Sequence, residues 1–525
     1  MTRAVLFHGG RIHVGDGRSA EALLARDGRV AAIGPARDLR REAPDAELID
    51  LRGGLMTPGW VDAHVHFVWW SIQMSQLDLR DARTVDEALA RVAAHARALP
   101  GGAWILGGRF DRNAWGRWPT AAELDRASAG HPAALRSRDG HSRWLNSEAL
   151  RRVGIGPDTT PPAGGTILRD ASGAPTGILQ ENANDLVDAV VPPPTDAEML
   201  EAARHGQTEA WQRGLTGFEN LDAFRDRFTL ATFQRLHDAG ELAMRAHIGI
   251  PRTAIDEALD RGLRTGAGDD WLRVGHLKIF TDGALGSQTA ALEQPYLGTD
   301  DRGVLTVEPE ELARLVARAA AGGIAVAVHA IGDRAVRVAL DAIAPTRATA
   351  PALRPKIEHV QLVRADDLDR FARHGIVASM QPLHATSDRD LANRYWGAER
   401  VTRAYPWRAL LSSGATLAFG SDAPVEPIDP LLGIHAAVAR RRPGDAEAWT
   451  PAQRLTLDEA LAGYAAGPAY ALGRERELGT LATGMRCDAT VVDRDLARCR
   501  EDELLDARVR ATVTDGVVRF ADGLA

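Results

Sequence analysis

The sequence contains only two cysteines, Cys487 and Cys499, which excludes a fold held together by a framework of disulfide bonds. It also lacks an uninterrupted apolar run of about 18 residues, the length that a transmembrane helix requires. A strand-like pattern begins near Ala4, too early for a secretory signal peptide to precede it. These absences predict a cytoplasmic protein without membrane spans.

Long runs of like charge are absent as well. The 63 Lys and Arg residues and the 71 Asp and Glu residues are interspersed, and the net charge is −8. This balance argues against nucleic acid or an anionic membrane surface as a partner. No Gly-x-Gly-x-x-Gly pattern follows a strand-like segment and no Gly-Lys-Ser/Thr pattern occurs, so a nucleotide-binding phosphate loop is not predicted.

Between residues 57 and 477, strand-like and helical segments alternate. The stretches between the apolar segments carry helical periodicity, as at Glu308–Ala321. Eight strands that alternate with helices predict an α/β protein with a (β/α)8 TIM barrel rather than an open doubly wound sheet. The predicted strands are the segment that ends at His66 and Leu215–Leu221, Met244–Ile250, Leu272–Phe280, Ile324–Ala330, Lys356–Gln361, Ile376–Gln381 and Thr416–Ser421.

The two ends of the chain consist of short strand-like segments joined by glycine turns. Residues 1–56 have this character, and residues 478–525 add a hairpin pattern at Asp515-Gly516. Neither end has enough apolar residues for a core of its own. We therefore predict one small β-sandwich domain built from both termini, the alternative being that each end packs separately on the barrel.

Residues 68–200, approximately, interrupt the alternation after the first barrel strand. This stretch is far longer than an ordinary connection from strand to helix. It contains a helical segment at Val85–Leu99 and turn sequences such as Gly164-Gly165. We predict an inserted subdomain, at the face of the barrel where active sites form.

Two histidines one residue apart, His64 and His66, end the first barrel strand. Side chains at positions i and i+2 of a strand point to the same face, so both imidazoles can converge on one point. Neutral imidazole is a common ligand of zinc-type ions, which makes a metal site the first hypothesis. An isolated His-x-His pair is more often two polar residues on a half-exposed strand. Whether this pair binds a metal ion therefore depends on the residues at the ends of the other barrel strands.

The ends of four other barrel strands carry residues of the same kind, namely Lys278, His329, His359 and Asp422. Each has an ordinary structural explanation, such as an aspartate that caps the next helix, but their joint occurrence at one face favours a metal site. A divalent ion polarises a carbonyl oxygen and lowers the pKa of a bound water. A neighbouring carboxylate can move the proton of that water, and Asp422 is our candidate for this acid/base role.

The order His-x-His, Lys, His, His, Asp on a barrel with β-structured ends resembles the amidohydrolase superfamily over nearly the whole chain. It is most similar to amidohydrolase family 3, the branch of YtcJ-like proteins and N-substituted formamide deformylases. The segment Gly484–Asp488 departs from the usual Gly-Lys-x-Ala-Asp, which concerns only the terminal β-structure. The motifs that carry the resemblance are Arg138–Asn146, Lys278–Ser287, His329–Asp333, Ser379–Pro382 and Ser421–Val425.

The resemblance implies a divalent metal, zinc before others, and cleavage of a C–N bond in an amide, formamide or related small molecule. In this family a lysine at this strand end commonly reacts with carbon dioxide, which implies a carboxylated Lys278 that bridges two ions. The alternative is an ion pair of Lys278 with Asp282 or Asp422 beside a single ion. Many relatives are homodimers, which we expect here too. The implied metal ligands are His64, His66, Lys278, His329, His359 and Asp422.

Two other kinds of function compete with the C–N hydrolase. A deaminase or a lactonase or esterase would use the same barrel. A barrel that has lost catalysis and acts as a binding or scaffold protein should lack metal-binding residues, whereas all six predicted metal-ligand positions are filled.

Other residues near the strand ends are candidates for contact with the substrate. They are Trp69, His141, Asp282, Gln381 and His384.

Overall fold

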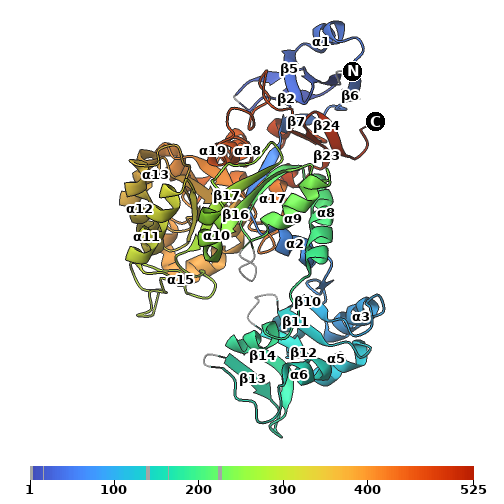
Figure 1. Ribbon diagram of the computed structural model, residues 1–525, viewed down its shortest axis with the longest axis vertical. Helices are drawn as coiled ribbons and strands as arrows, with labels where there is room; N and C mark the ends of the chain where they lie inside the picture. The colour runs from blue at the N-terminus through green and yellow to red at the C-terminus, as the bar shows by residue number, and fades with distance from the viewer. Residues whose placement is uncertain (1–3, 16, 138–141, 163–164, 223–227, 525) are drawn as a thin grey trace. The chain divides into compact units, whose positions relative to one another are not determined.

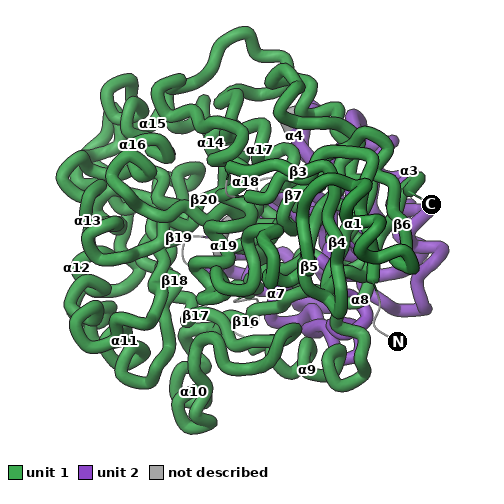
Figure 2. Tube along the Cα trace, turned by 90° about the horizontal axis from the view of Figure 1, so that it is seen from above, with its two compact units in different colours: residues 1–70, 203–525 green, residues 71–202 purple. Residues whose placement is uncertain are grey.

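The computed structural model describes residues 4–524, apart from residues 16, 138–141, 163–164 and 223–227. It divides into two compact units (Figure 2). The first comprises Met1–Trp70 and Ala203–Ala525, and the second comprises Ser71–Ala202.

An eight-stranded parallel sheet forms the centre of the first unit (Figure 1). Its strands lie side by side in the order in which they occur along the chain. The strands predicted from the sequence are all present, with small shifts at their ends, and the predicted TIM barrel is confirmed. They are β8 (Trp60–Val65), β15 (Leu215–Asn220), β16 (Arg245–Pro251), β17 (Leu272–Phe280), β18 (Val326–Ala330), β19 (Lys356–His359), β20 (Val377–Met380) and β21 (Leu417–Phe419).

The first and last strands of this sheet, β8 and β21, meet and close it into a barrel. The backbone N–H of Asp422 donates to the carbonyl oxygen of His64 at 2.7 Å, and that of His66 donates to Ala423 at 2.9 Å. In a closed parallel barrel, all strands end at the same face. The polar residues at the strand ends therefore gather at one mouth.

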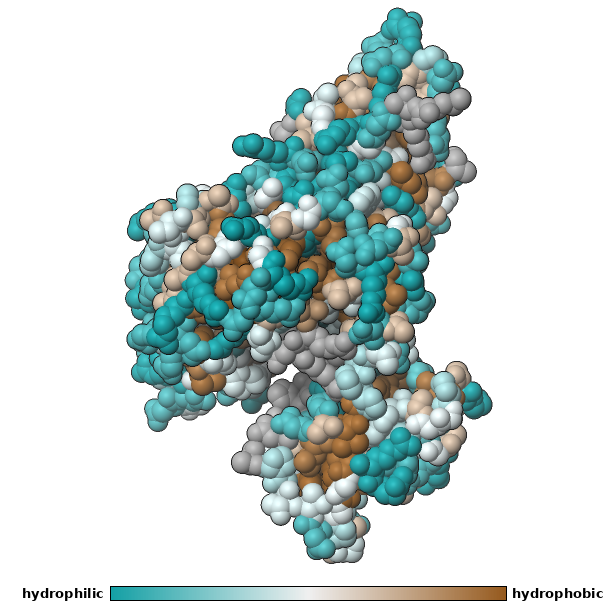
Figure 3. Space-filling view, viewed as in Figure 1, coloured by the Kyte–Doolittle hydropathy of each residue, from teal (hydrophilic) through white to brown (hydrophobic). Residues whose placement is uncertain are grey.

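Helices cover the outside of the barrel. In α11, Leu312, Val316 and Ala319 are buried and lie on one side of the helix. Over α11 and α12, the surface in Figure 3 is mainly hydrophilic. Helices that follow barrel strands or flank them are α9 (Leu230–Asp238), α10 (Ile255–Asp260), α11 (Pro309–Ala321), α12 (Asp333–Ile343), α13 (Leu368–His374), α14 (Pro382–Ser387), α15 (Arg389–Val401), α16 (Trp407–Ser412), α17 (Pro430–Ala439), α18 (Leu457–Tyr464) and α19 (Ala466–Ala471).

Segments from both ends of the chain form two further sheets. Met56 of β7 pairs with Val491 of β22, so strands from the two termini share one sheet, as predicted. Phe7 and Val513 belong to one apolar core between the sheets. The sheets have the orders β5-β4-β1-β6 and β24-β23-β22-β7-β2-β3. Their strands are β1 (Ala4–His8), β2 (Arg11–His13), β3 (Ser19–Ala20), β4 (Ala22–Arg26), β5 (Arg29–Gly34), β6 (Glu47–Asp50), β7 (Leu55–Pro58), β22 (Ala489–Val492), β23 (Val509–Thr514) and β24 (Val517–Ala521), with α1 (Ala36–Glu42) beside them.

The second unit leaves the barrel within α2 (Phe67–Met74) and returns within α8 (Asp196–Gln212). It has its own sheet, in the order β13-β14-β12-β11-β10-β9, and its own core, which includes Val92, Phe110 and Trp144. Its elements are β9 (Leu77–Asp78), α3 (Val85–Ala96), β10 (Ile105–Phe110), α4 (Arg112–Trp115), α5 (Ala121–Ala127), β11 (Ala133–Ser137), β12 (Ser142–Leu145), α6 (Ser147–Val153), β13 (Gly165–Arg169), β14 (Pro175–Glu181) and α7 (Asp185–Asp188).

No helix in the described part of the chain is both long enough and apolar enough to cross a bilayer.

Candidate metal centre

His64 and His66 lie at the carboxyl end of β8, and Asp422 lies just beyond β21, the strand beside it. Asp422 Oδ1 is 3.4 Å from His64 Nε2 and 3.1 Å from His66 Nε2. One ligand atom from each of these three residues lies within 4.8 Å of the others. Two imidazole nitrogens and a carboxylate oxygen at this spacing can bind one divalent ion.

A second group of possible ligands shares Asp422 with the first. It adds His359, which ends β19, and His384, which lies on α14. His384 Nε2 is 3.7 Å from Asp422 Oδ2, and the two histidine rings stack with centroids 5.9 Å apart. The two oxygens of Asp422 therefore face different histidine groups, an arrangement suited to two neighbouring ions.

Lys278 and His329 complete the set that the sequence predicted as ligands. Lys278 is buried on β17, and its Nζ is 3.2 Å from His64 Nε2. The His329 ring lies 4.5 Å from that of His359, centroid to centroid. The structure thus brings all six predicted ligand residues together at one mouth of the barrel.

Burial and mutual proximity set the charge states of these side chains. Burial lowers the pKa of His64 to about 4, with Lys278 adding to the effect, and lowers that of His359 well below its usual value. Burial also lowers the pKa of Lys278 to about 8. Burial alone would raise the pKa of Asp422, but His64 and His66 lower it well below its usual value. Neutral imidazoles beside an ionised carboxylate are the protonation states that metal ligation requires.

Three histidines have a polar side chain near Nδ1, and in two of them a hydrogen bond orients the ring. His64 Nδ1 donates to Glu358 Oε2 at 2.7 Å, and His359 Nδ1 donates to Gln381 Oε1 at 2.8 Å. Asp222 Oδ1 is 3.6 Å from His66 Nδ1. Partners of this kind fix the tautomer and direction of metal-binding imidazoles and leave Nε2 for the ion.

Sequence reasoning missed Glu358 and Asp222. One signal was available for Glu358, since a glutamate inside a short, otherwise buried strand needs a partner. Asp222 follows β15 in the same way that the predicted ligands follow their strands. Nothing in the sequence distinguishes a side chain that orients a ligand from the ligand itself.

The candidate substrate-binding residues have different surroundings. The Trp69 ring lies 5.7 Å from that of His66, at the edge of the site. Asp282 is buried, and its carboxylate accepts backbone N–H groups of Ala291 and Gly332, which ties it to the barrel loops. Gln381 orients His359, and His384 faces Asp422, as described above. His141 lies outside the described residues.

The donor set fits a divalent cation. Imidazole nitrogens and carboxylate oxygens are common zinc ligands. Among the described residues, neither His329 Nδ1 nor His384 Nε2 has a hydrogen-bond partner, although both atoms are buried. A bound ion or substrate would satisfy these two atoms.

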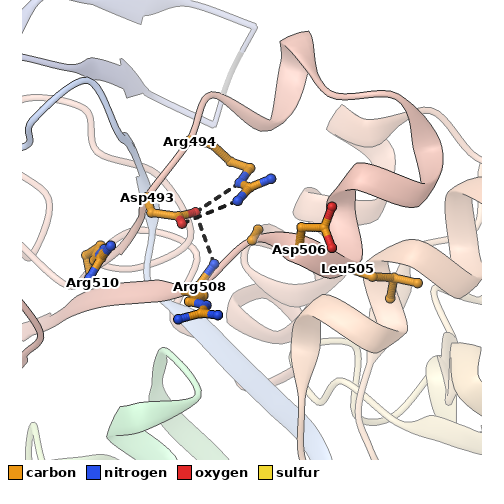
Figure 4. A pocket seen from close by; sticks show the side chains of 7 residues that line it. Asp493, Arg494, Leu505, Asp506, Arg508 and Arg510 are labelled. Atoms are coloured by element: carbon orange, nitrogen blue, oxygen red, sulfur yellow. Dashed lines mark hydrogen bonds and ion pairs between the residues drawn. The ribbon is translucent and has the colours of Figure 1, made fainter.

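A separate pocket lies in the C-terminal segment (Figure 4). Arg494 Nε and the backbone N–H of Arg508 both donate to Asp493 Oδ1 at 3.1 Å. Arg510 donates to Asp522 at 2.9 Å. None of the described residues that line this pocket is a histidine. We therefore place the candidate active site at the barrel mouth.

The chain resembles known proteins over most of its length. Residues 47–520 match the model of the amidohydrolase family. The chain belongs to this family. It is 32% identical over 531 residues to the putative amidohydrolase YtcJ of Bacillus subtilis, which covers 98% of this chain and 99% of that protein. It is 30% identical to N-substituted formamide deformylase of Arthrobacter pascens, over 95% of each chain.

A solved structure resembles this member of the amidohydrolase family over almost its full length. The crystal structure of an uncharacterized metal-dependent hydrolase from Pyrococcus furiosus matches with a TM-score of 0.79 and 29% identity. The match covers 94% of this chain and 99% of that one. Family and relatives together indicate a metal-dependent hydrolase that acts on small molecules.

Proposed function

We propose that the protein is a zinc-type hydrolase that cleaves a non-peptide C–N bond in an amide, a formamide or a related small molecule. The observation that carries this proposal is the position of Asp422 between two histidine groups, with one carboxylate oxygen toward each. The relative from Arthrobacter pascens, by its name a formamide deformylase, supports the choice of bond.

In this proposal, His64, His66, His329, His359 and Asp422 hold the metal. A divalent ion in this position would polarise the carbonyl of the substrate and make a bound water acidic enough to attack it near neutral pH. Asp422 accepts the proton of the attacking water and delivers a proton to the nitrogen of the leaving amine, so the proton balance closes. His64 and His359 are held by Glu358 and Gln381 and keep their rings in place during these steps.

Lys278 is proposed to carry a carbamate. Its amine, 3.2 Å from His64 Nε2, would add carbon dioxide and release a proton, which gives a carboxylate able to bridge two ions. With an unmodified Lys278, the centre would hold a single ion. Trp69, at the edge of the site, is proposed to contact the substituent of the substrate.

A panel of substrates tests the proposed bond. N-formyl and N-acyl amines, amino-substituted heterocycles, esters and lactones of matched size should be incubated with zinc-loaded protein, and the release of amine, ammonia or acid should be measured. We expect release of amine from the formyl or acyl amines. Turnover of only the esters, lactones or heterocycles would contradict the proposal. The homodimer and the cytoplasmic location stay predictions from the sequence.

A further inference from the structure

Lysine occurs at only two positions of this chain, Lys278 and Lys356, and all other residues among the 63 basic ones are arginine. Both lysines lie on barrel strands, and they are 2% and 0% exposed. An ammonium group is compact, whereas a guanidinium is a wide planar fork, so arginine cannot replace lysine in a confined site. Lys278 faces the candidate metal centre, and Lys356 has no role in the function proposed above.

Lys356 lies in a buried ionic cluster in the interior of the barrel. Its Nζ is 2.7 Å from Glu219 Oε2 and 2.9 Å from Glu358 Oε1. It also donates to the carbonyl oxygen of Ala63 at 2.6 Å. The side chains of Lys356, Glu219 and Glu358 are completely buried.

Such a cluster is unusual in this position, because the interior of a TIM barrel is normally filled by branched apolar side chains. Removing charges from water is costly, and well-packed apolar residues often give equal or greater stability. The need for a stable core therefore does not explain why a lysine and two glutamates occupy it.

Two contacts connect Lys356 to His64. The first passes through Glu358, whose other carboxylate oxygen accepts from His64 Nδ1 at 2.7 Å. The second passes through the backbone, because Ala63 directly precedes His64 on β8. Lys356 thus constrains both the imidazole ring and the strand that carries it.

We propose that Lys356 is a positioning residue of the metal centre: together with Glu358 it fixes the direction of His64, so that Nε2 faces Asp422 and Lys278. This inference rests on the proposed function, since it assumes that His64 binds a metal ion. Lys356 touches neither the substrate nor the ion. It acts through Glu358 and Ala63.

Glu219 provides a matched control on the other side of the same lysine. It is as deeply buried as Glu358 and contacts the same ammonium. Its further contacts are with His276, whose Nδ1 donates to Glu219 Oε1 at 2.6 Å and whose Nε2 donates to the carbonyl oxygen of Arg354 at 2.8 Å. His276 is therefore engaged away from the metal centre.

The test compares Lys356→Met, Glu358→Gln and Glu219→Gln with the wild-type protein. Zinc affinity is measured by competition with a chromophoric chelator, and the visible spectrum of the cobalt-loaded protein reports ligand geometry. We expect Lys356→Met and Glu358→Gln to bind zinc about 10- to 100-fold more weakly and to show altered cobalt bands. Glu219→Gln should keep the affinity within about threefold and the cobalt spectrum unchanged, because the contacts to His64 remain.

The outcomes separate this inference from the proposed function. If the wild-type protein binds zinc but Lys356→Met and Glu358→Gln bind it equally well, the positioning role is wrong and the metal site stands. Equal losses in Glu358→Gln and Glu219→Gln would also overturn the positioning role, because they would indicate a general effect on the core. If Lys356→Met does not fold, Glu358→Gln, which keeps the size of the side chain, decides alone. Failure of the wild-type protein to bind zinc would overturn both.

Discussion

Two of the buried polar clusters in the first unit differ in composition. Where the barrel meets the terminal β-structure, Arg245 binds both oxygens of Asp488 at 2.8 and 2.9 Å and reaches Asp515 at 2.6 Å. Arg486 also pairs with Asp515, at 3.2 Å. At the barrel mouth, by contrast, histidines and one lysine surround Asp422.

The difference teaches how to tell a structural cluster from a functional one. Arg245 and its two carboxylates satisfy one another through short, bidentate bonds, as in a permanent structural contact. At the mouth, the buried atoms His329 Nδ1 and His384 Nε2 have no hydrogen-bond partner in the described part of the chain. The first cluster joins the barrel to the terminal β-structure through arginine–carboxylate pairs, whereas the second gathers imidazole and carboxylate groups of the kind that bind a divalent ion.

The largest effect is expected for Asp422→Asn. The amide cannot accept the proton of the attacking water, so hydrolysis of the best substrate should fall by at least about a hundredfold. The protein should stay folded, as circular dichroism and thermal unfolding would report, and should keep part of its metal. Near-normal turnover would refute the acid/base role.

Lys278→Ala should also lose most of its activity, but here rescue is expected. If a carbamate bridges two ions, added bicarbonate or a short-chain carboxylic acid should restore part of the turnover, because its carboxylate can take the same place. Activity is measured over a concentration series of propionate, with Asp422→Asn as the control that propionate should not rescue. Full activity without any additive would contradict the carbamate.

Arg245→Met should reverse the pattern, with a large effect on stability and none on metal content. The substitution leaves Asp488 buried without its partner, which should lower the free energy of unfolding by about 3–5 kcal/mol. Denaturant unfolding measures this, and Arg510→Met, which removes a more exposed pair with Asp522, should cost less than about 1 kcal/mol. A loss of bound metal in folded Arg245→Met would contradict the division into two clusters.

The smallest effect is expected for Arg508→Ala in the pocket of Figure 4. This exposed side chain lies apart from the histidines, so metal content and turnover should stay at the wild-type level. Both are measured beside Asp422→Asn in the same assay. A strong loss of turnover would place part of the reaction in that pocket.

Much of the fold could be predicted from the sequence because its signals are local. Apolar runs such as Ile324–Ala330 coincide with barrel strands, and the ends of parallel strands lie at one face by geometry alone. The convergence of His64, His329 and Asp422 follows from that single rule. It requires no knowledge of side-chain packing.

The missed residues depend on packing between distant segments. Glu358 meets His64, 294 positions away, through the interior of the barrel, and no local pattern encodes that contact. The sequence predicts substrate contact for Gln381 and His384, and the structure adds that they lie beside His359 and Asp422. Sequence patterns identify which residues reach the mouth, and the structure supplies which of them face one another.

The most direct test is elemental analysis of protein purified without chelators, with and without added zinc, beside the variant in which His64, His66 and Asp422 are all replaced by alanine. We predict about two ions per chain in the wild-type protein and a clear loss in the triple variant. Arg245→Met should match the wild-type content. A wild-type protein that binds no metal even after zinc is added would contradict the assignment of this cluster as a metal centre.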